Sequence, residues 1–167
     1  MYEKNLPKKL SSFVGFTLIE LLVVMTIIGI LFGVGVAQYT NFNRRQILEQ
    51  ASRDLINNLR LAQTKAANGE KPPGCATLDG YKVSFSSGGT SNPDTYRIVA
   101  ICGGSEKGES KTFSLPSVVK FNPLPSPSEV LFKVLAQGTD LNNDLTITLT
   151  AFGKTKTITV TKQGKIE

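Results

Sequence analysis

The spacing of hydrophobic residues divides the chain into three parts. Residues 16–37 are almost continuously apolar, and Glu20 is the single ionisable side chain among these 22 residues. Residues 38–68 keep apolar side chains mainly at spacings of three and four, which is typical of an amphipathic helix. From residue 69 onward, short segments alternate between apolar and polar positions, which is typical of half-buried strands.

The apolar part is long enough to cross a membrane. At about 1.5 Å per residue, a helix over residues 16–37 spans about 33 Å, and the hydrocarbon core of a bilayer is about 30 Å thick. Gly29, Gly33 and Gly35 interrupt this segment. They favour either local unwinding or close packing against other helices, and the sequence supports both interpretations equally.

The amphipathic part continues the same helix. No proline interrupts it, and Asn68-Gly69 followed by Pro72-Pro73-Gly74 is a typical helix end. We therefore predict one helix from Phe16 to Asn68. Its apolar stripe, which must be buried against another part of the chain, consists of Ile47, Leu48, Ala51, Leu55, Leu59, Ala62 and Ala66.

The remaining segments predict strands only. Residues 81–85 and 96–101 alternate with period two and form a predicted hairpin around the polar segment 86–94. Prolines after residue 121 restrict residues 118–121 to an edge strand or a loop. Further predicted strands cover residues 111–115, 130–135, 145–150 and 157–161, the last two joined around Phe152-Gly153-Lys154. One long N-terminal helix followed by strands indicates an α+β fold, with the helix packed on antiparallel β-sheet.

Glu20 requires an explanation, because a carboxylate inside a membrane costs on the order of 3 kcal/mol. It either reaches back to the lipid headgroups or meets a cation. Cleavage between Gly15 and Phe16 would create such a cation, a new α-amino group. The amine of a neighbouring subunit is then the better partner for Glu20, and the pair would set the register of an assembly.

The segment Gly15-Phe16-Thr17-Leu18-Ile19-Glu20, preceded by Lys8 and Lys9 and followed by an apolar run, resembles the class III signal of type IV pilins and type II secretion pseudopilins. The resemblance implies cleavage after Gly15 by a prepilin peptidase, N-methylation of Phe16 and a role for Glu20 in assembly. It also implies a pilin-like fold. The alternative is an ordinary N-terminal anchor that carries an incidental acid.

The resemblance predicts four regions and a location. They are a leader peptide (1–15), a transmembrane and assembly helix (16–37), its amphipathic continuation (38–68) and a β-rich globular domain outside the membrane (69–167). Basic residues before the apolar segment favour a cytoplasmic N-terminus, hence a single-pass inner-membrane protein. Expected partners are prepilin peptidase, other pilin or pseudopilin subunits, the inner-membrane assembly platform and, before assembly, membrane lipid.

The amino-acid composition argues against several kinds of catalytic and metal site. The chain has no His and only two Cys, which argues against imidazole catalysis and against His or Cys zinc sites, so we expect no enzyme, cofactor or metal. In an exported domain Cys75 and Cys102 are expected to form a disulfide, and two free thiols are the alternative. Asp140, Asn142 and Asp144 have the alternation of a calcium loop but lack its Gly and its final Glu, so we interpret them as a turn.

The C-terminal third resembles minor pilins and pseudopilins of the GspH/FimT type. The resemblance rests on Leu115–Phe121, on Leu131-Phe132 to Gly138, and on a Thr-rich hairpin that runs into residues 160–166. It implies a structural subunit of a pilus or pseudopilus. The alternative function is a competence pilin that takes up DNA, for which the candidate contacts are Lys154, Lys156, Lys162 and Lys165. The same lysines would also suit a solvated sheet edge.

Overall fold

The computed structural model describes residues 15–167, except for the side chains of residues 34–37. The leader predicted over residues 1–15 therefore lies, apart from Gly15, outside the described residues. The internal contacts divide the chain into two units, Met1–Thr40 and Asn41–Glu167, and each is described by itself.

Helix α1 covers Leu18–Ala67, so the predicted helix from Phe16 to Asn68 is confirmed to within two residues at each end. The helix begins after Thr17, whose hydroxyl accepts a hydrogen bond from the Glu20 amide at 3.3 Å. After Ala67 the chain leaves the helical path at Gly69, which has a φ of +63°. The Gly69 and Glu70 amides donate to the carbonyls of Ala66 and Lys65, the two hydrogen bonds of a Schellman motif.

In the first unit, the apolar part of α1 is uncovered. Its most hydrophobic stretch, with a mean hydropathy of 2.5, buries none of its residues against the rest of the chain. Among the described residues, α1 is the one helix long and apolar enough to cross a membrane. Apolar surface of this extent is stable only against lipid or against other protein.

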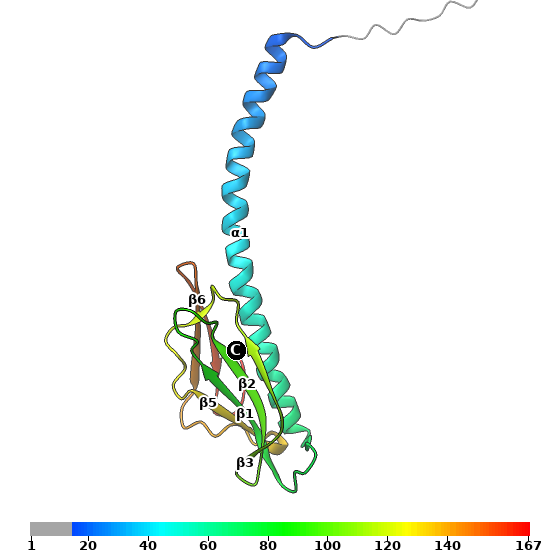
Figure 1. Cartoon of the computed structure of the whole chain (residues 1–167), viewed down its shortest axis with the longest axis vertical. Helices are drawn as coiled ribbons and strands as arrows, with labels where there is room; N and C mark the ends of the chain where they lie inside the picture. Colours follow the sequence, from blue (N-terminus) through cyan, green and yellow to red (C-terminus); the bar gives the residue numbers. More distant parts are fainter. Residues whose placement is uncertain (1–14) are drawn as a thin grey trace, which may run out of the picture. The chain divides into compact units, whose positions relative to one another are not determined.

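In the second unit, antiparallel strands form two sheets (Figure 1). The first has the order β3-β2-β1-β5 and consists of β1 (Leu78–Ser86), β2 (Thr95–Cys102), β3 (Ser105–Ser114) and β5 (Glu129–Lys133). The second has the order β4-β6-β7 and consists of β4 (Lys120–Phe121), β6 (Leu145–Ala151) and β7 (Lys154–Val160). The α+β fold of a long helix on antiparallel strands is thus confirmed, with the strands divided between two sheets.

Several strands differ from their predicted bounds; β1 begins at Leu78 rather than Tyr81, and β7 begins at Lys154 rather than Thr157. Strand β3 begins at Ser105 rather than Lys111, because its first residues are exposed and polar and so show no alternation. Strand β5 stops at Lys133, and the short 3₁₀ turn η1 (Val134–Ala136) follows it. The residues Leu135 and Ala136 have φ values of +55° and +56°, which end the extended conformation.

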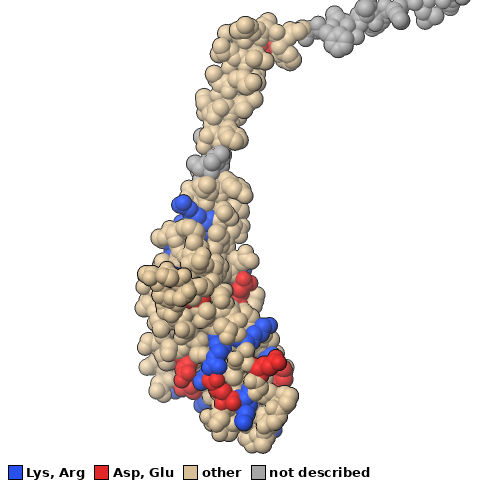
Figure 2. All heavy atoms as spheres, in the orientation of Figure 1, with Lys and Arg blue, Asp and Glu red and all other residues tan. Residues whose placement is uncertain are grey.

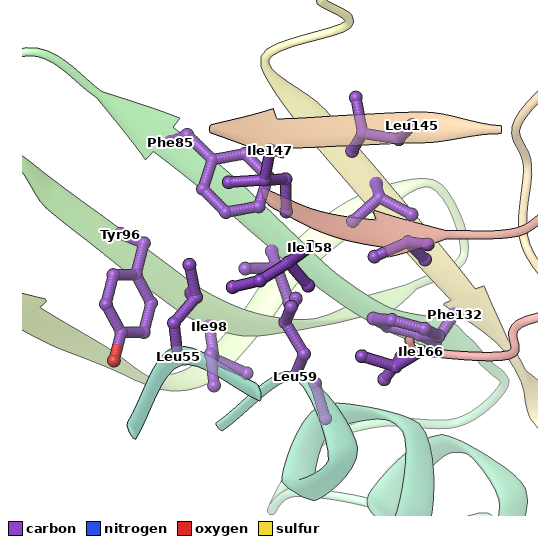
Figure 3. Close-up of a cluster of buried hydrophobic side chains, with 14 of the residues drawn as sticks. Leu55, Leu59, Phe85, Tyr96, Ile98, Phe132, Leu145, Ile147, Ile158 and Ile166 are labelled. Atoms are coloured by element: carbon purple, nitrogen blue, oxygen red, sulfur yellow. The ribbon is translucent and has the colours of Figure 1, made fainter. Parts of the chain in front are cut away.

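The core lies between the second half of α1 and the two sheets. Figure 3 shows Leu55 and Leu59 of α1 among side chains from both sheets, including Ile98 of β2 and Ile158 of β7. Each leucine is fully buried, and such burial contributes about 2 kcal/mol per side chain. The predicted stripe is confirmed, because its members from Leu48 to Ala66 are buried and Ile47 is partly buried.

Candidate functional site

The peptide bond between Gly15 and Phe16 lies in an open, irregular segment before α1. Among the described residues other than its neighbour in the chain, no atom lies within 4 Å of the position that a Cβ on Gly15 would take, and Phe16 is 82% exposed. A protease must draw an extended segment into its active site, so an accessible bond outside the helix is a suitable substrate. The geometry thus leaves the predicted cleavage position free of tertiary contacts within the described chain.

Glu20 occupies the first turn of α1, where the helix N-terminus carries a partial positive charge that favours an acid. Its backbone amide is held by the Thr17 hydroxyl, and the Leu21 amide donates to the Thr17 carbonyl at 3.2 Å. No described residue donates a hydrogen bond to the Glu20 carboxylate or pairs with it. The backbone of Glu20 is therefore fixed, while its carboxylate stays available to an amine from outside the chain.

Sequence reasoning missed the role of Thr17. The spacing Thr17-Leu18-Ile19-Glu20 before an apolar run is the S/T-x-x-E pattern of a capping box, in which the first side chain accepts the amide of the fourth residue. That pattern was visible in the sequence. Thr17 is thus a positioning residue for Glu20 through the first helical turn.

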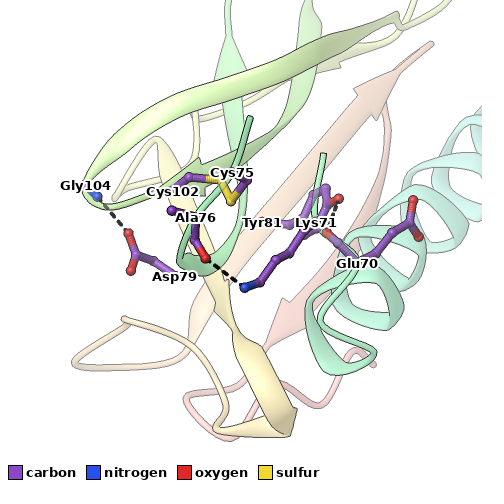
Figure 4. The surroundings of a disulfide bond; sticks show 8 residues. All are labelled: Glu70, Lys71, Cys75, Ala76, Asp79, Tyr81, Cys102 and Gly104. Atoms are coloured by element: carbon purple, nitrogen blue, oxygen red, sulfur yellow. Dashed lines mark hydrogen bonds between the residues drawn. A yellow bond between two sulfur atoms is a disulfide. The ribbon is translucent and has the colours of Figure 1, made fainter. Parts of the chain in front are cut away.

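Cys75 and Cys102 form a disulfide with a Cα–Cα distance of 5.7 Å. The bridge joins the segment after α1 to the end of β2 and lies among short polar contacts (Figure 4). The Asp79 carboxylate accepts the Gly104 amide at 2.7 Å, and the Tyr81 hydroxyl donates to the Glu70 carbonyl at 2.9 Å. Together these contacts hold the segment between helix and sheet against the open end of the β1–β2 hairpin.

The four candidate DNA-contacting lysines do not gather in one place. Lys154 and Lys156 lie at the start of β7, whereas Lys162 and Lys165 follow its end, and the strand from Lys156 to Val160 alone spans about 13 Å. Two of the four are paired with acids. Lys156 contacts Glu49 at 2.9 Å, and Lys165 pairs with Glu167. Contact between these lysines and DNA stays a prediction.

The side chains of Asp140 and Asp144 accept backbone hydrogen bonds that stabilise neighbouring loops. Asp140 accepts the Leu131 amide at 2.8 Å, and Asp144 accepts the Lys162 amide at 3.0 Å. Each carboxylate thus fixes the backbone of a neighbouring segment, which agrees with their interpretation as turn residues.

Comparison with known proteins supports the signal at the start of the chain. Residues 15–36 match the family model described as the prokaryotic N-terminal methylation motif. Comparisons with curated proteins and with solved structures gave no match. The matched residues include the open Gly15–Phe16 bond, the Thr17 cap and the available Glu20 carboxylate. The chain therefore carries a class III prepilin signal like that of type IV pilin and pseudopilin precursors.

Proposed function

We propose that this protein is a minor pilin or pseudopilin of the GspH/FimT type, a non-enzymatic structural subunit of a type IV pilus or type II secretion pseudopilus. Prepilin peptidase cleaves between Gly15 and Phe16, and Phe16 is then N-methylated. The observation that carries the proposal is an acid without a partner in the described chain at the head of an uncovered apolar helix, within the matched motif.

Assembly satisfies both features of the first unit. The uncovered apolar side chains exchange lipid for the helices of neighbouring subunits. The Glu20 carboxylate meets the new amine of Phe16 on an adjoining subunit, and this ion pair offsets the cost of about 3 kcal/mol of an acid in an apolar setting. Because the pair forms in only one axial register, it also aligns the subunits.

The second unit needs no rearrangement for this role. Its apolar stripe from Leu48 to Ala66 is already buried on the strands. The Thr-rich β6–β7 hairpin, which runs into residues 160–166, supports the likeness to the GspH/FimT type. We place the N-terminus in the cytoplasm and the β-rich domain outside, with the assembly platform and other pilin subunits as partners.

The direct test is Glu20→Gln in the native host with its own assembly machinery. We expect the variant to be cleaved and methylated normally, as read from the N-terminus by mass spectrometry, but to be absent from the sheared filament fraction. Thr26→Val is the matched control, because it changes a polar side chain of the same helix, one that bonds only its own Val23 carbonyl. Undiminished incorporation of Glu20→Gln would refute the assembly role.

A second test concerns processing. Gly15→Val places a branched side chain directly before the cleaved bond, and we expect the leader to be retained. The intact mass then includes residues 1–15, whereas the wild-type chain begins at N-methylated Phe16. A wild-type chain that still begins at Met1 beside active peptidase would exclude the proposed processing.

A further inference from the structure

A basic cleft of about 520 Å³ opens in the second unit, between α1 and the start of β7. Arg45 and Arg53 line it from the helix, and Lys154 and Lys156 line it from the strand. One acid, Glu49, also lines it, so its charged side chains sum to +3. We refer to these five residues and the space between them as the basic cleft.

The acid in the basic cleft is already engaged. The Glu49 carboxylate lies 2.9 Å from the Lys156 ammonium and 3.4 Å from the Arg53 guanidinium. The hydrogen bond from Lys156, followed by the charges of both cations, lowers the pKa of Glu49 and keeps it ionised. Arg45 and Lys154 are exposed and have no acidic partner within the described chain. The cleft therefore presents two free cations in a fixed frame.

One aromatic side chain lines the cleft, and a second precedes Lys154 in the turn before β7. Phe42 lines the cleft and is 59% exposed. Phe152, in the turn between β6 and β7, is 41% exposed, and the Arg44 guanidinium lies 5.3 Å from its ring centroid. Exposed aromatic rings beside cations are typical of protein surfaces at the boundary between lipid and water, where the ring meets apolar groups and the cation meets phosphate.

The covalent chain limits how far Arg45, at one side of the basic cleft, can lie from the membrane-spanning segment. Arg45 follows Ala37, the last residue of the predicted span, by eight residues. Eight residues reach at most about 28 Å when fully extended, and about 12 Å when helical. This reach allows Arg45 to meet the phosphates of the bilayer that holds residues 16–37.

We propose that the basic cleft binds the headgroup phosphate of an anionic phospholipid in this same bilayer and holds the domain on the membrane surface before assembly. An Arg fork and a Lys ammonium are the side chains that suit a phosphate. The inference rests on the proposed function only in requiring that residues 16–37 span a membrane. It does not depend on peptidase processing or on Glu20.

Lipid fits the basic cleft better than nucleic acid does. A duplex presents a long row of phosphates and is bound by an extended row of cations. Here the lysines lie at opposite ends of β7, whose residues from Lys156 to Val160 span about 13 Å, and two of the four are paired with acids. A single phosphate beside apolar acyl chains matches two free cations that line one cleft together with the exposed ring of Phe42.

Lysine footprinting on the full chain tests the proposal. The protein is reconstituted into nanodiscs of phosphatidylcholine alone or with about 30 mol % phosphatidylglycerol, an anionic lipid. N-hydroxysuccinimide acetate then acetylates accessible lysines, and mass spectrometry gives the rate at each. We expect Lys154 to react about fivefold more slowly in the anionic discs, as the attraction of one basic side chain to an anionic surface predicts. Lys107, exposed on β3, serves as the internal control and should not change.

Variants separate the cleft from general surface charge. Arg45→Gln removes one free cation of the cleft, and the protection of Lys154 should then be largely lost. Arg60→Gln removes the same charge from an exposed position of the same helix outside the cleft and should leave the protection intact. Both side chains are exposed, so neither change disturbs the core. Salt at about 0.5 M should abolish the protection by screening.

Three outcomes would overturn the proposal. The first is equal reactivity of Lys154 in both kinds of disc. The second is equal protection in phosphatidylcholine discs on addition of glycerol phosphate, which would assign the cleft to a free phosphate. The third is protection by a short DNA duplex without protection by phosphatidylglycerol, which would assign it to nucleic acid. A failure of Glu20→Gln to block incorporation would leave this result unaffected, so the two proposals fail separately.

Discussion

The Asp94 carboxylate accepts a hydrogen bond from the Phe121 amide at 2.7 Å, and this contact ties the start of β2 to β4 in the other sheet. Asp94 is fully buried. It also accepts the Gly88 amide at 2.9 Å and lies 3.4 Å from the Lys120 ammonium. A Cβ at Gly88 would come within 2.2 Å of the Pro93 carbonyl oxygen, so only glycine fits beside this carboxylate. One acid thus joins the β1–β2 turn to the second sheet.

Loss of this acid should destabilise the second unit. Asp94→Ala leaves the buried Phe121 amide and the half-buried Gly88 amide without this acceptor, and we expect the free energy of unfolding to fall by about 3 kcal/mol. Chemical denaturation of the full chain in detergent, followed by circular dichroism, measures it. Asp144→Ala is the matched control, because it removes an exposed carboxylate that accepts one amide, and it should cost about 1 kcal/mol or less. Similar losses for the two variants would contradict the role of Asp94.

The Thr17 cap should affect assembly without affecting cleavage. Thr17→Val removes the hydroxyl that holds the Glu20 amide, so the first turn frays and the backbone that carries the carboxylate is no longer fixed. A lost N-cap costs about 1 kcal/mol, which corresponds to about a fivefold fall in incorporation. Thr17→Ser keeps an acceptor and should behave like the wild type. Quantitative immunoblots of sheared filaments give the comparison, and wild-type incorporation of Thr17→Val would exclude this positioning role.

A charged row across the first sheet should determine the response of stability to acid. The Glu106 carboxylate on β3 accepts two hydrogen bonds from the Arg97 guanidinium on β2, at 2.8 and 2.9 Å, and lies 2.9 Å from the Lys82 ammonium on β1. Figure 2 shows acidic and basic side chains interspersed on the face of the domain turned to the viewer. The Arg97 and then the Lys82 hydrogen bonds lower the pKa of Glu106 to about 2 from its ordinary value of 4.5.

The sign of this effect follows from the lowered pKa. The unfolded chain takes up the proton near pH 4.5 and the folded chain only near pH 2, so the Glu106 contribution is complete above pH 4.5 and is lost as the pH falls through about 2. We expect carbon NMR of the Glu106 carboxyl to titrate with a midpoint near pH 2. Between about pH 2 and pH 4.5, the free energy of unfolding should depend less on pH in Glu106→Gln than in the wild type. An ordinary midpoint near 4.5 would show that the pairs do not persist in solution.

The disulfide should make stability sensitive to reductant. The bridge joins residues 27 positions apart, and the chain-entropy model assigns such a loop about 3 kcal/mol. We therefore expect reductant to lower the unfolding midpoint of the wild type, and Cys75→Ser with Cys102→Ser to show the lowered midpoint from the start. The double variant also serves as the control, because reductant should no longer change its unfolding midpoint. If complete reduction left the unfolding midpoint of the wild type unchanged, the disulfide would not make this contribution to stability.

The parts of the fold that the sequence predicts are those set by local spacing. Leu55 and Leu59 are four residues apart and share one helix face, and Gly69 ends the helix through its own φ. The first residues of β3 were missed because an exposed edge strand carries no apolar alternation. The division into two sheets was missed because it depends on contacts such as that between Asp94 and Phe121, which lie 27 residues apart in sequence.

The residues of the candidate sites also fall into two groups, those that a local motif identifies and those that only the fold brings together. Gly15, Phe16 and Glu20 form a contiguous motif, so the sequence alone identifies them, and Thr17 could have been found from its spacing to Glu20. The basic cleft could not, because Glu49 and Lys156 come together only when β7 packs beside α1. Local motifs identify the segment that is processed, whereas the cleft exists only in the folded domain.

The bridge between Cys75 and Cys102 has a consequence for following the protein in cells. Thiols stay reduced in the cytoplasm and pair in an oxidising compartment. Under the proposed topology, alkylation of both thiols would mark molecules whose domain has not yet left the cytoplasm, and resistance to alkylation would mark those that have. The redox state of this cysteine pair would thus show whether a given molecule has been exported. It would do so whether or not the leader has been removed.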